Sequence, residues 1–284
     1  YENRPDQRQI GNIRSEKARV LYLMIAIRTQ EEIEKLRASN ELVAKTLGEL
    51  AKYIKAGVST NYLDKIAEEY IRDHGGIPAF LGYGGFPKTL CTSLNSAVVH
   101  GIPDDKTILN EGDIISVDCG VVLNEYYGDS AYTFAVGEIT ERVKHLLKVT
   151  KNSLFEGISE AREGKRIGDI GFKVQTYCEN AGFSVVREMV GHGIGRKLHE
   201  APEVPNYGKK GTGPMMKTGM VICIEPMINM GTRKIHQERD GWTIRTWDNL
   251  PSAHFELAVA IEKEKGDILG TFKYIEEVLG DKEF

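Results

Sequence analysis

Two aspartates on neighbouring β-type runs are the first residues that could do chemistry. Asp118 lies in the run Ile114–Val121 and Asp129 in the run Tyr126–Phe134. If the runs pair as an antiparallel hairpin centred on the 123–124 peptide bond, the aspartates face each other with Cβ atoms about 4.5–5.5 Å apart. Two carboxylates that close repel each other unless a proton or a cation lies between them. The pair therefore indicates a metal site, against the alternative that one aspartate is an ordinary turn or edge residue.

Three further side chains could complete such a site. Glu225 lies in the apolar run 221–226 and Glu256 in the apolar run 254–259. An anion inside an apolar strand is costly unless it is paired or bound to a metal. His192 lies between two glycines, which allow close backbone approach. Taken singly, each glutamate could be a salt-bridged or edge residue, and the histidine could be structural.

Together these residues form an oxygen-rich set with one imidazole. Four carboxylates would neutralise two divalent cations, and the set suits Mn²⁺, Fe²⁺, Co²⁺ or Zn²⁺. Two such ions about 3.5–4 Å apart can share a water molecule and lower its pKa. The sequence therefore predicts hydrolytic chemistry.

The composition excludes several other classes of protein. The 284 residues carry a net charge of −4 without a basic block, so nucleic acid is not an expected partner. The four cysteines form no CxxC pair, which argues against a cysteine zinc site or a disulfide framework and favours a reducing cytoplasm. The apolar run 20–27 is too short to span a membrane, which takes about 20 residues. Cys91 and Cys119 have no surroundings in the sequence that would make a nucleophile of either.

The candidate ligands lie in or beside strands that both halves of the chain supply. Two 19-residue segments, Gly57–Gly75 and Gly164–Gly182, match at an offset of 107 residues, which indicates an internal repeat unless the similarity is accidental. Strands are predicted over 89–100, 114–121, 126–134, 183–188, 220–228, 242–247 and 253–262, and helices over 29–54, 59–75 and about 140–161.

The sequence resembles the type I methionine aminopeptidases of the creatinase or pita-bread superfamily, from Ile25 to about Leu269. The motifs that carry the resemblance are FLGYGGFPKTLCTSLNSAVVHGIP (80–103), SVDCGVVLNEYYGDSAYTF (116–134), GHGIGRKLHEAP (191–202), IEPMI (224–228) and DGWTIRTWDNLPSAHFE (240–256). Prolidases and X-Pro aminopeptidases share the ligand set and the GHGIG…HE run. They are expected to lack the NSAVVHGIP stretch in this form.

The resemblance implies an α+β pita-bread fold, with a pseudo-two-fold antiparallel sheet flanked by helices on its outer face. Residues 24–284 would form a single catalytic domain. Residues 1–23 are polar and without clear periodicity up to Val20. We expect them to form a flexible extension foreign to the native chain, and we expect the native chain to begin at Met24.

The resemblance also implies a role for each candidate ligand. Asp118 would chelate one metal ion with both oxygens, and Asp129 and Glu256 would bridge two ions. His192 and Glu225 would complete the shell of the first ion. A hydroxide bridging the ions would attack the scissile carbonyl, and Glu225 would relay the proton to the leaving amine.

Two more histidines and an apolar pocket follow from the same resemblance. His199 would stabilise the tetrahedral intermediate, and His100 would contact the same peptide from the other side, although His100 could simply cap a turn. Leu198 stands where the family often has Phe, and Phe80 where a smaller residue is common. The predicted pocket for the methionine side chain consists of Phe80, Tyr83, Phe86, Cys91, Leu198 and Trp242.

The predicted activity is hydrolytic removal of the initiator methionine from nascent polypeptides when the second residue is small. The implied cofactors are two divalent ions: Co²⁺, Mn²⁺, Fe²⁺ or Zn²⁺. The expected partners are nascent N-termini and the ribosome, with no membrane and no nucleic acid, and we expect a cytoplasmic monomer. The alternatives are an X-Pro aminopeptidase or prolidase-like enzyme, and a non-catalytic pita-bread binding protein.

Overall fold

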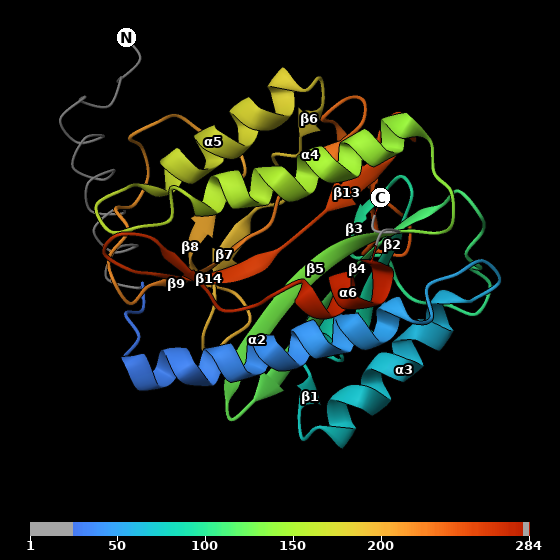
Figure 1. Cartoon of the computed structure of the whole chain (residues 1–284), viewed down its shortest axis with the longest axis horizontal. Helices are drawn as coiled ribbons and strands as arrows, with labels where there is room; N and C mark the ends of the chain where they lie inside the picture. The colour runs from blue at the N-terminus through green and yellow to red at the C-terminus, as the bar shows by residue number, and fades with distance from the viewer. Residues whose placement is uncertain (1–24, 281–283) are drawn as a thin grey trace, which may run out of the picture.

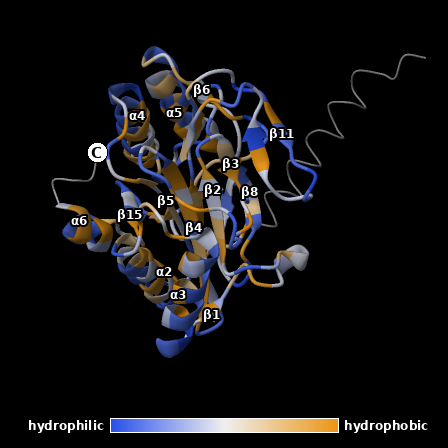
Figure 2. Ribbon diagram, turned by 90° about the vertical axis from the view of Figure 1, so that its right-hand side faces the viewer, coloured by the Kyte–Doolittle hydropathy of each residue, from blue (hydrophilic) through white to orange (hydrophobic). Residues whose placement is uncertain are grey.

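The helices of this computed structural model lie on one side of its strands (Figure 1, Figure 2). The structure describes residues 25–280 and Phe284, so the predicted extension at 1–23 lies outside the described residues. The described helices are α2 (Gln30–Ala51), α3 (Thr60–Asp73), α4 (Glu141–Ile158), α5 (Ile167–Asn180) and α6 (Lys273–Leu279), with a 3₁₀ turn at Tyr83–Gly85. The described strands are β1 (Ile77–Pro78), β2 (Leu90–Leu94), β3 (Ala97–Val99), β4 (Ile114–Leu123), β5 (Tyr126–Ala135), β6 (Ser184–Val185), β7 (Gly191–Gly193), β8 (Glu200–Val204), β9 (Val221–Ile224), β10 (Met227–Asn229), β11 (Ile235–Gln237), β12 (Ile244–Thr246), β13 (Ser252–His254), β14 (Leu257–Ile261) and β15 (Gly266–Ile268).

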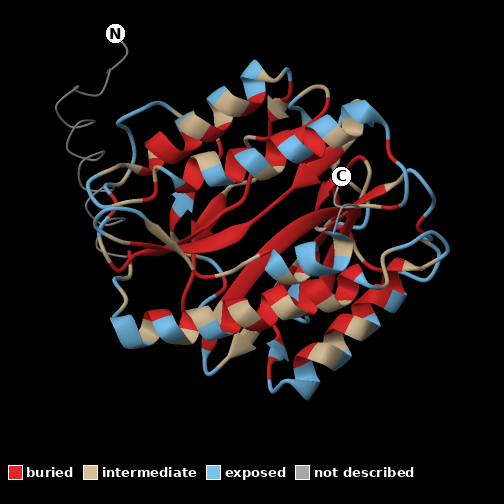
Figure 3. Ribbon diagram, in the orientation of Figure 1, coloured by how far each residue is buried: buried red, intermediate tan, exposed pale blue. Residues whose placement is uncertain are grey.

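Helix α2 begins where its sequence predicts. The Thr29 side chain accepts a hydrogen bond from the backbone N–H of Glu32, and the Glu32 carboxylate accepts one from the N–H of Thr29. This capping box satisfies two backbone donors that the first turn leaves without partners. The apolar stripe that follows, including Ile33 and Leu36, faces the strands and is buried (Figure 3).

The strands form ladders that are antiparallel throughout. One sheet runs β1-β4-β2, with β5 paired to β4, and another runs β15-β14-β9-β7-β8. Two three-stranded sheets, β13-β10-β6 and β11-β12-β3, complete the layer. This mixture of helices and antiparallel sheets confirms the predicted α+β class. None of the helices within the described part of the chain has the length and apolar character needed to cross a membrane.

The register of the β4–β5 hairpin corrects one prediction. Asp118 lies opposite Ala131 and not opposite Asp129. The turn consists of Asn124 and Glu125, both with positive φ (50° and 68°), so the hairpin is centred one residue later than expected. Positive φ at both central residues is the mark of the tight two-residue hairpin turn that matches strand twist. Because Asp129 and Ala131 are two residues apart, both aspartates still point to the same face.

The backbone supports the predicted repeat. At the offset of 107 residues, the helices α3 and α5 match, and each is followed by a short strand. Contacts outside the helices recur at the same offset. An isolated β-bridge joins Ser59 to Ile108, and another joins Arg166 to Met215. The N–H of Gly57 donates to the carbonyl oxygen of Leu109, and that of Gly164 donates to the carbonyl oxygen of Met216. The two halves of the chain therefore contain equivalent helices, joined to their strands by equivalent connections.

Five of the predicted strands are shorter or interrupted, among them the run 242–247, which contracts to β12. The run 89–100 divides into β2 and β3 at a turn where Asn95 has a φ of 51°. The run 183–188 contracts to β6. The run 220–228 is interrupted at Glu225 and Pro226, between β9 and β10, because Pro226 has no N–H for the ladder, and the run 253–262 is interrupted at Phe255 and Glu256, between β13 and β14. The interruption at Pro226 determines the geometry of the site.

Candidate active site

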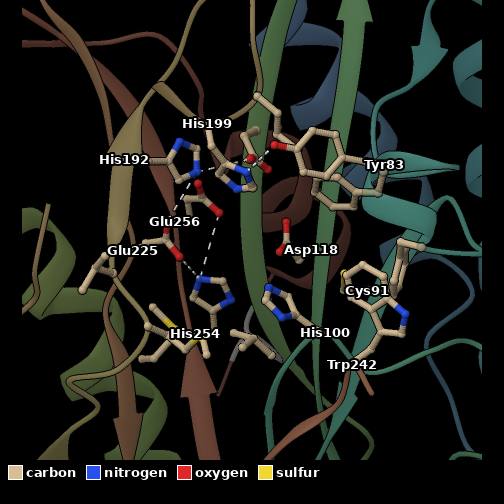
Figure 4. Close-up of a pocket in the computed structure, with 18 of the residues that line it drawn as sticks. Tyr83, Cys91, His100, Asp118, His192, His199, Glu225, Trp242, His254 and Glu256 are labelled. Carbon is tan, nitrogen blue, oxygen red and sulfur yellow. Dashed lines mark hydrogen bonds and ion pairs between the residues drawn. The ribbon is translucent and has the colours of Figure 1, made fainter. Parts of the chain in front are cut away.

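Every predicted site residue lines one cavity of about 300 Å³. In the close-up, His192, Glu225 and Glu256 lie on one side of this cavity, and Tyr83 and Trp242 lie on the other (Figure 4). The predicted residues that the structure brings together here are Phe80, Tyr83, Phe86, Cys91, His100, Asp118, Asp129, His192, Leu198, His199, Glu225, Trp242 and Glu256.

The two glutamates occupy a shared break in two neighbouring strands. Ile224 pairs with Leu257 on one side of the break, and Met227 pairs with His254 on the other. The register is the same on both sides, so Glu225 and Glu256 stand opposite each other. The direct cross-strand carboxylate pair that the sequence predicts for the two aspartates is thus formed by the glutamates.

The hairpin of the aspartates is joined to this break by hydrogen bonds. The N–H of Glu256 donates to the carbonyl oxygen of Ala131 over 2.9 Å. The hydroxyl of Ser130 donates to the carbonyl oxygen of Glu256 over 2.7 Å. Since Asp129 precedes Ser130 and shares a face with Ala131, β5 brings its carboxylate to the glutamate pair.

His192 faces this carboxylate cluster through one nitrogen. Its Nε2 lies 3.8 Å from Asp129 Oδ2 and 3.6 Å from Glu225 Oε1. Its Nδ1 lies 2.9 Å from the carbonyl oxygen of Gly193, which can only accept a hydrogen bond, so Nδ1 carries the proton. Burial lowers the pKa of His192 to about 4, with a smaller contribution from His199. The imidazole is therefore neutral near pH 7, and its contacts with the carboxylates are not ion pairs.

Burial raises the pKa of every carboxyl group in the cluster. It raises the pKa of Asp118 to about 6. The pKa values of Asp129, Glu225 and Glu256 stand well above their ordinary range, first because of burial and then because of the neighbouring carboxylates. Removing four anions from water at one point is unfavourable without compensating positive charge.

The cluster fits bound metal ions. Asp118 Oδ1, Asp129 Oδ1 and Glu256 Oε1 are buried and have no hydrogen-bond partner. One donor atom from each of Asp129, His192 and Glu256 lies within 4.8 Å of the others, together with the sulfur of Cys223. Burial raises the pKa of Cys223 well above its ordinary value, so it stays a thiol, and the oxygen and imidazole atoms are the available ligands.

His100 and His199 face the cavity near this cluster. The Tyr83 hydroxyl lies 2.8 Å from His199 Nδ1, which leaves Nε2 of that ring for another partner. His100 has a φ of 61°, an uncommon conformation for a residue other than glycine, and it is held by the hydrogen bonds of Gly101 with Thr92 and Ser93. Burial lowers the pKa of both histidines, to about 4 for His100.

The other side of the cavity is apolar. Phe80, Phe86, Cys91 and Leu198 are buried there, and the ring of Trp242 meets that of Phe86 edge-on at 5.1 Å. Burial raises the pKa of Cys91 well above its ordinary value, so its thiol is not a nucleophile. The wall suits an unbranched apolar side chain.

Sequence reasoning missed several residues of this cavity, and among them His254 lies beside the carboxylates. It lies two residues before Glu256, inside the quoted motif, and its Nε2 is 3.5 Å from Glu225 Oε2. Alternation along a strand could have placed it on the face of Glu256. The remaining unpredicted lining residues are Val99, Glu188, Met189, Val190 and Met227.

Comparison with known proteins identifies the family of this chain. Residues 34–263 match the model of metallopeptidase family M24. A methionine aminopeptidase of Clostridium acetobutylicum is 50% identical over 246 residues, which cover 87% of this chain and 98% of that protein. Methionine aminopeptidase 1 of Bacillus subtilis is 49% identical over 246 residues, covering 87% of this chain and 99% of the relative.

Solved structures show the same fold. The crystal structure of methionine aminopeptidase from Rickettsia prowazekii superposes with a TM-score of 0.86 at 41% identity, covering 87% of this chain and all of that one. A prolidase from Pyrococcus furiosus gives a TM-score of 0.73 at 21% identity, over 95% of this chain and 74% of that one, which shows likeness of fold alone. The predicted pita-bread fold is thus confirmed. The chain belongs to metallopeptidase family M24, and its sequence places it among the methionine aminopeptidases of that family.

Proposed function

We propose that this enzyme removes the initiator methionine from nascent polypeptides whose second residue is small, in the cytoplasm. The observation that carries the proposal is a single cavity with a carboxylate and imidazole cluster on one side and an apolar wall on the other. The cluster suits hydrolysis of a peptide bond, and the wall suits the side chain that precedes this bond. The relatives named methionine aminopeptidase support this choice of substrate.

The cluster would hold two divalent metal ions, of Co²⁺, Mn²⁺, Fe²⁺ or Zn²⁺. The residues that would bind them are Asp118, Asp129, His192, Glu225 and Glu256, whose four negative charges match two dications. When bound, such ions supply a water molecule of lowered pKa and polarise a carbonyl oxygen. The buried oxygens without partners support this assignment.

The remaining steps belong to side chains of the protein. Glu225, which lines the cavity, would accept a proton from the attacking water and deliver it to the leaving amine. His199 would donate a hydrogen bond to the oxygen of the scissile peptide, with its ring held by the Tyr83 hydroxyl. His100 would contact the same peptide from the opposite side of the cavity.

The apolar wall would bind the methionine side chain. An unbranched thioether adapts to an irregular pocket and makes favourable contacts with aromatic rings. Phe80, Phe86 and Trp242 supply such rings, and the neighbouring Cys91 remains a neutral thiol.

A peptidase assay tests the proposal. The peptide Met-Ala-Ser is incubated with the protein and Mn²⁺ or Co²⁺, and the released methionine is measured. We expect activity that depends on the metal and falls by about 10²–10⁴ in Glu225→Gln, since proton transfer by a positioned side chain contributes a factor of this size. Full activity in the variant or in the presence of a chelator would contradict the mechanism, and preferred cleavage of X-Pro peptides would indicate a prolidase-like enzyme instead.

We also propose that the protein acts as a monomer on N-termini that emerge from the ribosome, through the catalytic domain. Sedimentation of the purified protein tests the first statement, and co-sedimentation with translating ribosomes tests the second. A dimer, or an absence of ribosome binding, would contradict the respective statement.

A further inference from the structure

His254 is a buried histidine inside the carboxylate cluster that the proposed function does not use. Its side chain is 2% exposed, and its Nε2 has no hydrogen-bond partner. The ring points at Glu225 and Glu256 (Figure 4). An imidazole nitrogen without a partner in the interior loses its hydrogen bonds to water, and no hydrogen bond within the protein compensates for this loss.

The distances from this nitrogen are those between two ligands of one ion. Nε2 lies 3.5 Å from Glu225 Oε2 and 4.0 Å from Glu256 Oε2. These separations are long for hydrogen bonds, which fall at about 2.7–3.2 Å. Two atoms that each lie about 2.1 Å from the same ion are about 3.0–4.2 Å apart, for angles of 90° to 180° at the ion. Nε2, Glu225 and Glu256 therefore match a shared coordination sphere.

His254 repeats the arrangement of His192 on the other oxygen of the same glutamate. His192 Nε2 lies 3.6 Å from Glu225 Oε1 and 3.8 Å from Asp129 Oδ2, within the same range. Donor atoms of Glu225, His254 and Glu256 lie within 4.8 Å of one another, as do those of the group around His192. Glu225 thus has one imidazole beside each of its oxygens.

Hydrogen bonds hold the backbone of His254 in place. The N–H of His254 donates to Thr133 Oγ1 over 2.9 Å, and its carbonyl oxygen accepts from the same hydroxyl over 2.8 Å. That hydroxyl also lies 2.8 Å from Ser116 Oγ, one strand further into the sheet. The segment therefore cannot slide along β5 without loss of these buried bonds.

We infer that His254 is a metal ligand, through Nε2, of the ion held between Glu225 and Glu256. This inference rests on the proposed metal centre, to which it adds a second imidazole. Nitrogen ligands favour Co²⁺ and Zn²⁺, whereas carboxylates suit Mn²⁺. His254 therefore shifts the preference of its site away from Mn²⁺.

A structure of the wild-type protein crystallised with Co²⁺ tests the ligand directly. We expect Nε2 of His254 at about 2.1 Å from an ion. The inference would be overturned if two ions are bound, Nε2 lies more than 3 Å from both, and His254 forms a hydrogen bond with Glu225 in place of the metal bond. That outcome would leave the proposed function standing. A protein that takes up no ion would overturn the proposed function itself.

Metal affinity provides a second test in solution. Co²⁺ and Mn²⁺ are titrated against a fluorescent chelator with the wild type, with His254→Gln, and with the control His145→Gln, which changes an exposed histidine on α4. Loss of the imidazole should weaken Co²⁺ binding at one site by about 10–100-fold, with a smaller effect on Mn²⁺, and the control should match the wild type. Unchanged Co²⁺ affinity in a variant with the wild-type circular dichroism spectrum would refute the inference. If His254→Gln does not fold, the Co²⁺ structure of the wild type decides.

Discussion

Neutralising one of the buried carboxylates should stabilise the metal-free protein near pH 7. In the protein kept free of metal by a chelator, the half-buried Asp118 has one buried oxygen that faces other carboxyl groups, and the loss of surrounding water raises its pKa from 3.8 to about 6. A carboxyl group whose pKa is raised in the folded state contributes stability below its unfolded pKa, and this stability is lost as the pH rises through the folded pKa. At pH 7.5 the folded protein therefore carries the full cost of the ionised Asp118, and Asp118→Asn removes that cost.

The size of the effect follows from the shift. About two pKa units correspond to about 3 kcal/mol in the free energy of unfolding. At pH 4.5 Asp118 is mostly protonated in the folded state, so Asp118→Asn should raise the free energy of unfolding by only about 1 kcal/mol. In a chain of this size, 3 kcal/mol corresponds to a rise of about 6–12 °C in Tm.

Thermal unfolding with a chelator at pH 7.5 and pH 4.5 measures this difference. The matched control is Asp73→Asn, an exposed aspartate at the end of α3, which should change the free energy of unfolding by less than about 0.5 kcal/mol. Added Co²⁺ should reverse the order, since ligand at 1,000 times its Kd stabilises the wild type by about 4 kcal/mol. The electrostatic account would be refuted if, in the presence of the chelator, Asp118→Asn is no more stable than the wild type at pH 7.5. It would also be refuted if the variant gains the same free energy of unfolding at both pH values.

Three further changes follow from contacts in the site. Tyr83→Phe removes the 2.8 Å contact with His199 and should lower kcat/KM for a methionyl peptide about tenfold; an unchanged kcat/KM would show that the hydroxyl does not orient the ring. Gly101→Ala would place a Cβ 2.1 Å from the Thr92 carbonyl oxygen and should cost about 2 kcal/mol or more in urea unfolding, whereas a wild-type midpoint would contradict the crowding. Trp242→Ala opens the apolar wall and should raise KM for methionyl peptides more than it lowers kcat, and a pure kcat defect would argue against a binding role.

Local signals in the sequence predicted what depends on neighbours along the chain. The helices predicted over 29–54 and 59–75 begin as expected, with Thr29 and Ser59 as their caps, because capping needs only a side-chain oxygen within three residues of its donor. The candidate ligands also converge as expected. An anion such as Glu256 in an apolar run must be compensated wherever the strand lies, so its apolar neighbours made it a candidate, and the matched motifs supplied its role.

Properties that depend on contacts across the fold escaped the sequence. The register of the hairpin depends on positive φ at Asn124 and Glu125, a conformation that these residue types adopt less readily than glycine. The facing of Glu225 and Glu256 depends on a register between strands that are distant along the chain. Alternation could have placed His254 on the face of Glu256, but its contact with Glu225 depends on the register between two strands that are distant along the chain.

The shared break of Glu225 and Glu256 has a consequence for the order in which the chain acquires its charges during synthesis. The hairpin of Asp118 and Asp129 is translated before either strand of the break, and Glu256 is the last of the carboxylates to emerge. Until then the aspartates have no glutamate pair to face and no closed cluster to enter. The chain can bind its metal ions as described only after Glu256 has joined β5, so activity requires that the strands on both sides of the break have been translated.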